Sequence, residues 1–250
     1  MRSILFSIMA FALPIATQPA VPCTALRAAL ARPDKGFGAQ NSGAAHALIR
    51  TENGVRFELK SGDHWPHDAM QDKGHTERER SELSGPPYTP GTEMTAHWTI
   101  NIEPGPPTTN RWTIFTQVHQ LDFDGQQTYT VPLAIGLIPG DRLYVRATSN
   151  PKNTYNNFRD VVNWKSETPL VRGVPHHFEV RVLMDDSPTN RGYLRVMADG
   201  VMIVDYKGPI GAQGTFGYYW KYGLYRDQTK NSFAIVMSDI QFRGKACGTS

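Results

Sequence analysis

Three short motifs contain the residues whose types and spacing could do chemistry. They are Arg80-Ser81-Glu82-Leu83, Gln117-Val118-His119 and Tyr219-Trp220-Lys221-Tyr222-Gly223-Leu224-Tyr225. Each motif lies in a segment whose pattern predicts a β-strand, and alternate side chains of a strand share one face. Cations, an amide, an imidazole and phenols would then lie on one side of a sheet. Such a face could bind a carboxylate and place a proton donor and a proton acceptor beside it.

Two of these side chains suit a carboxylate and two suit proton transfer. Arg80 has a planar guanidinium that can bind a carboxylate at two points, and Gln117 can donate amide hydrogens to the same group. His119 has an ordinary pKa of about 6.5, which suits a base near neutral pH. Tyr225 titrates near pH 10 in its ordinary state. As a phenol it can protonate a leaving oxygen.

Further residues on or near these motifs could bind a ligand. A cation at Lys221 or Arg226 is expected to lower the pKa of Tyr225. Arg78 would share the face of Arg80, and Tyr219 would share the face of Lys221. The remaining candidates for substrate contact are Trp65, His67 and Lys165.

Each motif also has a purely structural interpretation. Arg80 and Glu82 could form an ion pair that supports the sheet, and Glu82 fits an orienting role better than a catalytic one. Trp220 and Tyr222 would lie on the opposite face from Lys221 and are expected in the core. Trp65 could equally anchor a loop.

The rest of the chain predicts an all-β fold. Apolar and polar residues alternate in short segments about every ten residues, with turn residues between them, which is typical of a sandwich or barrel. Helical periodicity is confined to 24–31, and 149–166 is expected to form a long loop beside the site. The expected architecture is a jelly-roll sandwich of two antiparallel sheets with a concave groove. The predicted strands are 55–59, 79–83, 93–102, 112–119, 133–138, 141–147, 176–183, 193–198, 201–206, 220–226 and 233–242.

The two ends of the chain indicate export. A basic start followed by an apolar run from Ile4 to Ile15 is typical of a secretory signal, and that run is shorter than the roughly 20 residues that span a bilayer. We therefore expect a signal peptide at 1–20, a single domain at 21–250, and a secreted or periplasmic protein. The only cysteines are Cys23 and Cys247. In a secreted chain they are expected to form a disulfide that joins the two ends.

Composition and charge narrow the classes of partner. The formal net charge is only +3 and no basic run stands out, which disfavours nucleic acid. A membrane partner is not expected either, and a monomer is the simplest expectation. Near the stretch 64–75, a cation could be bound by three histidines and three aspartates, but no zinc-type spacing is present. These residues are His64, His67, His75, Asp63, Asp68 and Asp72. No cofactor is therefore expected.

Taken in order, the three motifs resemble the signatures of jelly-roll polysaccharide lyases. Alginate lyases of this type carry an R-[ST]-E-[LV] strand, a Q-[IV]-H strand and a Y-F-K-A-G-x-Y strand. The spacing Lys221-x-Gly223-x-Tyr225 is also similar to heparin lyase I-like and glucuronan lyase-like proteins. The resemblance covers roughly 54–242, and this chain departs from the alginate lyase pattern at Tyr222 and Asp227.

The resemblance implies a concanavalin-like jelly roll and a secreted enzyme that cleaves a uronic-acid polysaccharide by β-elimination. Alginate, glucuronan and heparin-like glycans are the implied substrates, and endo action is expected because an open groove suits internal cleavage. Tyr225 would act as acid, or as both acid and base, and His119 as base or as a neutraliser of charge. Some relatives use calcium, so a structural Ca²⁺ remains an option.

Two other functions fit the same fold. A non-catalytic glycan-binding module could use the same groove, although binding alone needs no acid–base pair. A glycoside hydrolase needs two carboxylates that flank the bond, and Asp122 with Asp124 is the nearest arrangement of that kind.

Overall fold

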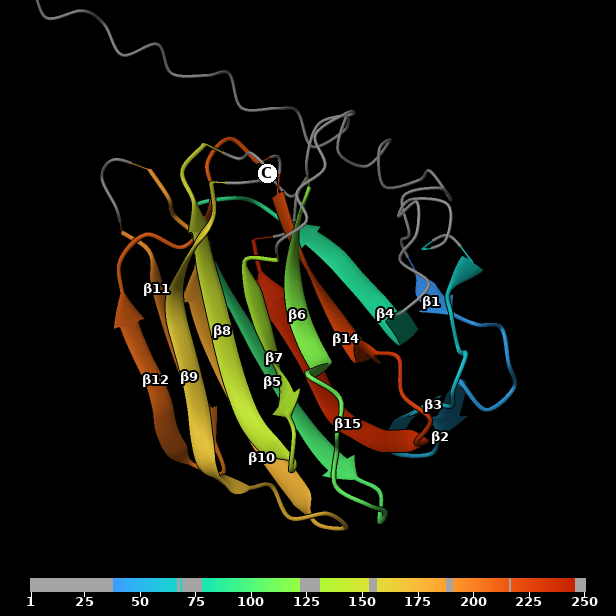
Figure 1. Cartoon of the computed structure of the whole chain (residues 1–250). Coiled ribbons are helices and arrows are strands. Elements are labelled where there is room, and N and C mark those ends of the chain that lie inside the picture. The colour runs from blue at the N-terminus through green and yellow to red at the C-terminus, as the bar shows by residue number, and fades with distance from the viewer. Residues whose placement is uncertain are drawn as a thin grey trace, which may run out of the picture.

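The computed structural model describes residues 38–66, 68, 78–121, 131–152, 157–187, 191–215 and 217–245. These residues form two sheets that pack face to face, with almost all neighbouring strands antiparallel (Figure 1). The all-β sandwich expected from the sequence is therefore confirmed. In this part of the chain, no helix is long and apolar enough to cross a membrane.

The first sheet contains the three motifs. Its strand order is β1-β4-β14-β6-β7-β8-β13, and β9 also pairs with β8. The strands are β1 (Ala39–Asn41), β4 (Arg78–Tyr88), β14 (Gly217–Asp227), β6 (Thr113–Leu121), β7 (Leu133–Ile138), β8 (Arg142–Asn150), β13 (Gly211–Ala212) and β9 (Arg159–Pro169).

The second sheet covers the inner face of the first. Its order is β12-β11-β10-β5-β15-β3-β2. The strands are β12 (Val201–Lys207), β11 (Tyr193–Ala198), β10 (Pro175–Leu183), β5 (Glu93–Ile102), β15 (Phe233–Gly244), β3 (Gly54–Leu59) and β2 (Leu48–Thr51).

Large apolar side chains from both sheets meet between them. Strand β10 shows the cause, because its residues alternate strictly between exposed and buried from Pro175 to Val182. Phe178 stacks on Trp98 of β5 with ring centroids 5.4 Å apart and also packs against Phe115 of β6 in the other sheet. Each fully buried ring of this kind contributes up to about 3 kcal/mol through the hydrophobic effect. This core fixes the first sheet from behind and leaves its outer face for polar residues.

The expected long loop at 149–166 is wrong for most of its length. Strand β8 continues to Asn150, and β9 begins at Arg159 and pairs with it. Strand β9 is rich in polar residues because only one of its faces is covered: Val162 and Trp164 pack against the core, whereas Lys165 is exposed. A strand near a sheet edge can be this polar, and such a strand cannot be predicted from the hydrophobic pattern alone.

Several expectations fall outside the described residues. These are the signal at 1–20, the helical segment 24–31, the Cys23–Cys247 disulfide and His67. The division into a signal and one domain at 21–250 stays a prediction.

Gly223 is required where β14 passes between its neighbours. Its φ is 128°, and an added Cβ would lie 2.3 Å from the carbonyl oxygen of Ser81 on β4. The register of β14 against β6 shifts between Tyr222 and Tyr225. The irregularity at Gly223 therefore sets how Tyr225 is aimed relative to Lys221.

We predict that Gly223→Ala destabilises the fold by about 2 kcal/mol or more, through backbone strain and the clash with Ser81. Urea denaturation measures the change. Gly91→Ala is the matched control, because Gly91 also has positive φ, 69°, but an added Cβ there meets nothing within 4 Å. An equal loss in the two variants would contradict the close-packing argument.

Candidate active site

The three motifs lie on adjacent strands, in the order β4-β14-β6. Tyr225 of β14 pairs with Arg80 of β4. Lys221 of β14 pairs with Gln117 of β6, and Tyr219 pairs with His119. Directly paired residues share a face of a sheet. The structure therefore brings together all the residues that the sequence placed on the three strand faces.

Glu82 lies at the centre of this face and is 1% exposed. Its carboxylate accepts a hydrogen bond from Gln117 Nε2 at 2.5 Å and another from Lys221 Nζ at 2.5 Å. Arg80 Nη1 lies 3.3 Å from the same carboxylate. A buried carboxylate is stable only when its charge is compensated in this way. Glu82 thus joins one side chain from each motif strand.

Arg80 is held on several sides. Its Nε lies 3.0 Å from Asp68 Oδ2, and its Nη1 donates to Gln40 Oε1 at 2.8 Å. Its guanidinium carbon lies 4.2 Å from the ring centroid of Tyr225 and 5.6 Å from that of Trp65. The sequence suggested an open fork for a carboxylate, but most of this fork is already engaged. Arg80 instead supplies positive charge from a fixed position.

His119 is half-buried on β6, and its ring stacks on Tyr219 with centroids 5.5 Å apart. Burial lowers the pKa of His119 well below 6.5, and the charges of Lys221 and Arg80 lower it further. The imidazole is therefore neutral at neutral pH and has a nitrogen that can accept a proton.

The pKa of Tyr225 is raised, not lowered as we expected. Burial favours the neutral phenol and outweighs the cations Arg80 and Arg78, which act in the opposite direction. Arg226 does not help, because it faces the other side of β14 and donates from Nε to Glu79 at 2.7 Å. The phenol keeps its proton and can act as a donor.

Lys221 is 1% exposed, and its pKa is lowered to about 8. The largest cause is burial, followed by repulsion from Arg80, and Glu82 opposes both. Near neutral pH Lys221 is still mostly charged. A small rise in pH would remove that charge.

The remaining candidates are placed unevenly. Trp65 lies beside Arg80 and is buried, and Arg78 is close enough to influence the Tyr225 pKa. Lys165 lies on β9 and pairs with Tyr144 of β8. Tyr144 belongs to an apolar cluster against which Tyr225 packs, so Lys165 lies on the same face as Tyr225. Arg226 is buried in its ion pair with Glu79 and does not reach this face.

Two residues that were not predicted to contact the motif residues also take part in this network. Gln40 comes from the short strand β1, and Asp68 comes from the loop in which the sequence suggested it only as a possible cation ligand. Burial raises the pKa of Asp68 even though Arg80 is near. Gln117 Oε1 is buried without a hydrogen-bond partner. The amide nitrogen of Gln117 must face Glu82, since a carboxylate only accepts, so this oxygen is turned away from Glu82.

The described part of the loop that suggested a metal makes structural contacts. Asp63 accepts hydrogen bonds from Ser42, His46 and the backbone of Lys60, and His64 bonds to the carbonyl of Arg78. In the described ranges, no group of three or more His, Cys, Asp or Glu residues is arranged to hold a metal ion.

The fold and this face together define a jelly-roll protein with an imidazole and a phenol beside buried cations. A family described as polysaccharide lyase matches residues 47–241. The chain belongs to that family, and the protein is a polysaccharide lyase.

Solved structures show the same fold. An endo-β-1,4-glucuronan lyase from the fungus Trichoderma reesei matches with a TM-score of 0.62 and 13% identity, covering 85% of this chain and 89% of that one. An alginate lyase from Pseudomonas aeruginosa matches with a TM-score of 0.54 and 20% identity, covering 82% and 88%. The family 7 alginate lyase A1-II′ matches with a TM-score of 0.58 and 14% identity, covering 86% and 99%. No curated protein matches the chain.

We predict that Glu82→Ala costs about 3–5 kcal/mol, because it leaves Lys221 and Arg80 buried without their shared carboxylate. Urea denaturation at neutral pH measures the loss. The double variant Glu82→Leu with Lys221→Met removes one charge of each sign and should lose clearly less stability than Glu82→Ala alone. A double variant that is less stable than the single one would contradict the charge argument.

Proposed function

We propose that this lyase cleaves a uronic-acid-containing polysaccharide by β-elimination and acts within the chain. The observation that carries the proposal is the placement of a neutral His119 and a protonated Tyr225 around the buried cations Arg80 and Lys221. Those cations suit a sugar carboxylate. The imidazole and the phenol suit the two proton transfers of an elimination.

The reaction removes the proton at C5 of the uronate and breaks the bond between C4 and the glycosidic oxygen. His119 takes the C5 proton, the freed electron pair forms the C4–C5 double bond, and Tyr225 protonates the leaving oxygen. Charge that develops on the carboxylate is stabilised by Arg80 and Lys221 in a largely dry environment. The pKa directions favour this assignment, since His119 lacks a proton and Tyr225 retains one.

Gln117 is positioned to complete the carboxylate site. Glu82 fixes the orientation of its amide and uses one of its two N–H groups. The second N–H and the unpartnered Oε1 remain for a sugar carboxylate and a sugar hydroxyl. Either contact would orient the ring relative to His119 on the same strand.

The charge network argues against hydrolysis on this face. A glycosidase needs two carboxylates with separate roles. Glu82 and Asp68 are both bound to Arg80, and Glu82 also holds Lys221. Asp122 and Asp124 lie outside the described residues.

We further propose that the protein is secreted or periplasmic and works as a monomer without a cofactor. The support for export is the apolar run after a basic N-terminus and the pair of cysteines at the chain ends. The support for a cofactor-free mechanism is that protein groups already supply the base, the acid and the cations.

The substrate class is tested by incubating the protein with polyglucuronate, alginate, heparin and a neutral glucan. Ultraviolet absorbance from the unsaturated uronate should rise with at least one acidic polymer and not with the glucan. A rapid fall in viscosity early in the reaction would indicate internal cleavage. Reducing ends that appear without the absorbance would overturn β-elimination.

We predict that Tyr225→Phe lowers kcat by at least about 100-fold, because it removes the proton donor. Substrate affinity should change little, since a phenylalanine ring can still lie against the Arg80 guanidinium as Tyr225 does. Absorbance assays give kcat, and calorimetry with a short oligouronate gives affinity. Full activity in this variant would exclude Tyr225 as the acid.

We predict a bell-shaped pH profile of kcat/KM. Activity should persist below pH 6.5 and fall only as His119 gains a proton, because its pKa is lowered. The alkaline side should fall near pH 8, where Lys221 loses its charge. Lys221→Arg should move the alkaline side upward by more than about one pH unit, since arginine stays charged. An unmoved alkaline side in a folded Lys221→Arg protein would assign it to another group.

A further inference from the structure

A hollow lined by positively charged side chains lies at the edge of the second sheet, away from the motif face. Its volume is about 510 Å³, and it is lined by Arg191, Gly192, Tyr193, Arg195, Lys207 and Gly208. Three of these six residues are cations and none is a carboxylate. Tyr193 and Lys207 are direct cross-strand partners on β11 and β12. The hollow therefore belongs to the sheet itself.

Two glycines form part of its lining. The amide of Gly208 donates to the carbonyl of Gly192 at 2.9 Å. A Cβ on Gly192 would lie 2.3 Å from the carbonyl oxygen of Gly208 and 2.8 Å from the carbonyl oxygen of Asp185. The close approach of these backbones excludes side chains at Gly192. The two glycines therefore form the part of the lining without side chains, and Arg191, Tyr193, Arg195 and Lys207 form the rest.

The cations around the hollow are only partly neutralised. Asp205 lies 3.1 Å from Arg195 Nε, and Asp185 lies 3.5 Å from Arg191 Nε. Within the described ranges Lys207 forms no ion pair, and it is exposed. Arg195 stands directly opposite Arg181 of β10, which is itself paired with Glu93 at 3.0 Å, and Glu93 also accepts a hydrogen bond from the hydroxyl of Tyr193. Each of the three arginines thus has one carboxylate partner, and the unopposed charge of Lys207 gives this part of the surface a net positive charge that favours an anionic ligand.

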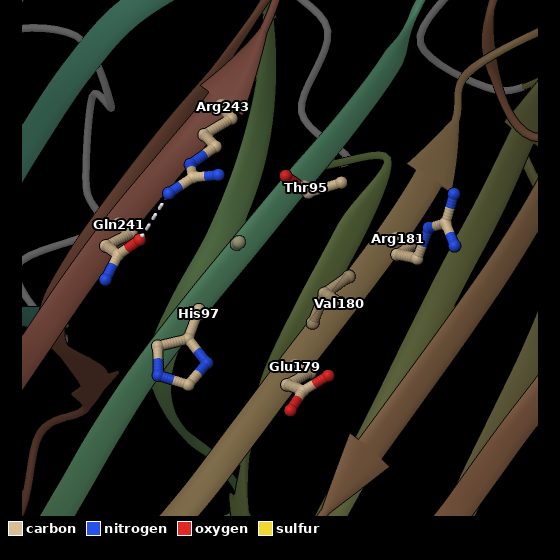
Figure 2. A pocket seen from close by; sticks show the side chains of 8 residues that line it. Thr95, His97, Glu179, Val180, Arg181, Gln241 and Arg243 are labelled. Atoms are coloured by element: carbon tan, nitrogen blue, oxygen red, sulfur yellow. Dashed lines mark hydrogen bonds between the residues drawn. The ribbon is translucent and has the colours of Figure 1, made fainter.

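A neighbouring hollow on the same sheet lacks this bias. Figure 2 shows Arg181 and Arg243 there together with Glu179 and His97, on strands β5, β10 and β15. Arg243 donates to Gln241 at 3.0 Å. Because the carboxylate of Glu179 is part of this lining and Arg181 is paired with Glu93, this neighbouring hollow selects less strongly for an anion.

The cationic hollow lies next to the edge of the sheet that carries the motif face. Strands β12 and β9 contact each other and run side by side in Figure 1. Strand β9 belongs to the first sheet and presents Lys165 on the motif face. A polymer that crosses this face toward β9 and passes the edge would next meet β12 and its Lys207.

We propose that this hollow is a second, non-catalytic binding site for an acidic sugar of the same polysaccharide. Arg191, Arg195 and Lys207 would bind the sugar carboxylate, and Tyr193 would contact the apolar face of the ring. The inference rests on the proposed function for the identity of the polymer. Occupation of both sites by one chain would raise affinity for polymer over that for short oligosaccharides.

The test uses a double variant that combines Arg195→Glu and Lys207→Glu. Its control is the single variant Arg243→Glu, which reverses a charge on β15 of the same sheet. Binding is measured in the Tyr225→Phe background by electrophoresis through gels that contain polyglucuronate, alginate or neutral dextran. The double variant should weaken polymer affinity by about tenfold or more, and Arg243→Glu should have a much smaller effect. In the Tyr225-containing enzyme, the double variant should leave turnover of a tetrasaccharide unchanged.

The outcomes separate this inference from the proposed function. Equal losses in the double variant and in Arg243→Glu, or no loss in either, would overturn the second site while leaving the lyase reaction intact. Polymer binding that depends on Arg195 and Lys207, in a parent protein that releases no unsaturated uronate, would support the second site and overturn the proposed reaction. Retardation by dextran equal to that by polyglucuronate would overturn recognition of the carboxylate.

Discussion

The charge of one buried carboxylate organises the motif face. Glu82 is almost completely removed from water, so its negative charge must be balanced within the protein. The balance comes from Arg80 on its own strand, Lys221 on β14 and, as a neutral donor, Gln117 on β6. The same contacts that make burial of Glu82 tolerable therefore hold three strands in one register. Stability and the geometry of the site depend on the same atoms.

This network also separates the proton affinities of the groups around it. Burial, and after it the positive charge of Lys221 and Arg80, lowers the pKa of His119. Burial, helped by the carboxylates of Asp68 and Glu82, raises the pKa of Tyr225 and keeps the phenol neutral. A base without a proton and an acid with one are thus present together near neutral pH. In a dry site each of these charges acts more strongly than it would in water. Preorganisation of charge, more than any single contact, prepares this face for an elimination.

The sequence predicted the sheet architecture because alternation of apolar and polar residues directly reflects one covered face. It also placed Tyr225 and Lys221 on one face, since strand alternation survives the irregularity at Gly223. It missed β9, whose exposed face makes it polar, and Gln40 and Asp68, whose roles depend on contacts between distant segments. The expected effect of Arg226 on Tyr225 failed for a geometric reason: adjacent strand residues face opposite sides.

The balance of charge on the motif face limits how tightly one sugar can bind there. Arg80 and Lys221 are already opposed by Asp68 and Glu82, so a uronate carboxylate finds little uncompensated positive charge in the ground state. The same cations gain more when negative charge grows on that carboxylate during proton removal, which is the difference that accelerates a reaction. Affinity for the substrate must then come from sugars bound elsewhere along the chain. Cations far from the reacting bond, such as Lys165 on β9, are suited to that role, and a polymer is a better substrate for such a protein than a single linkage.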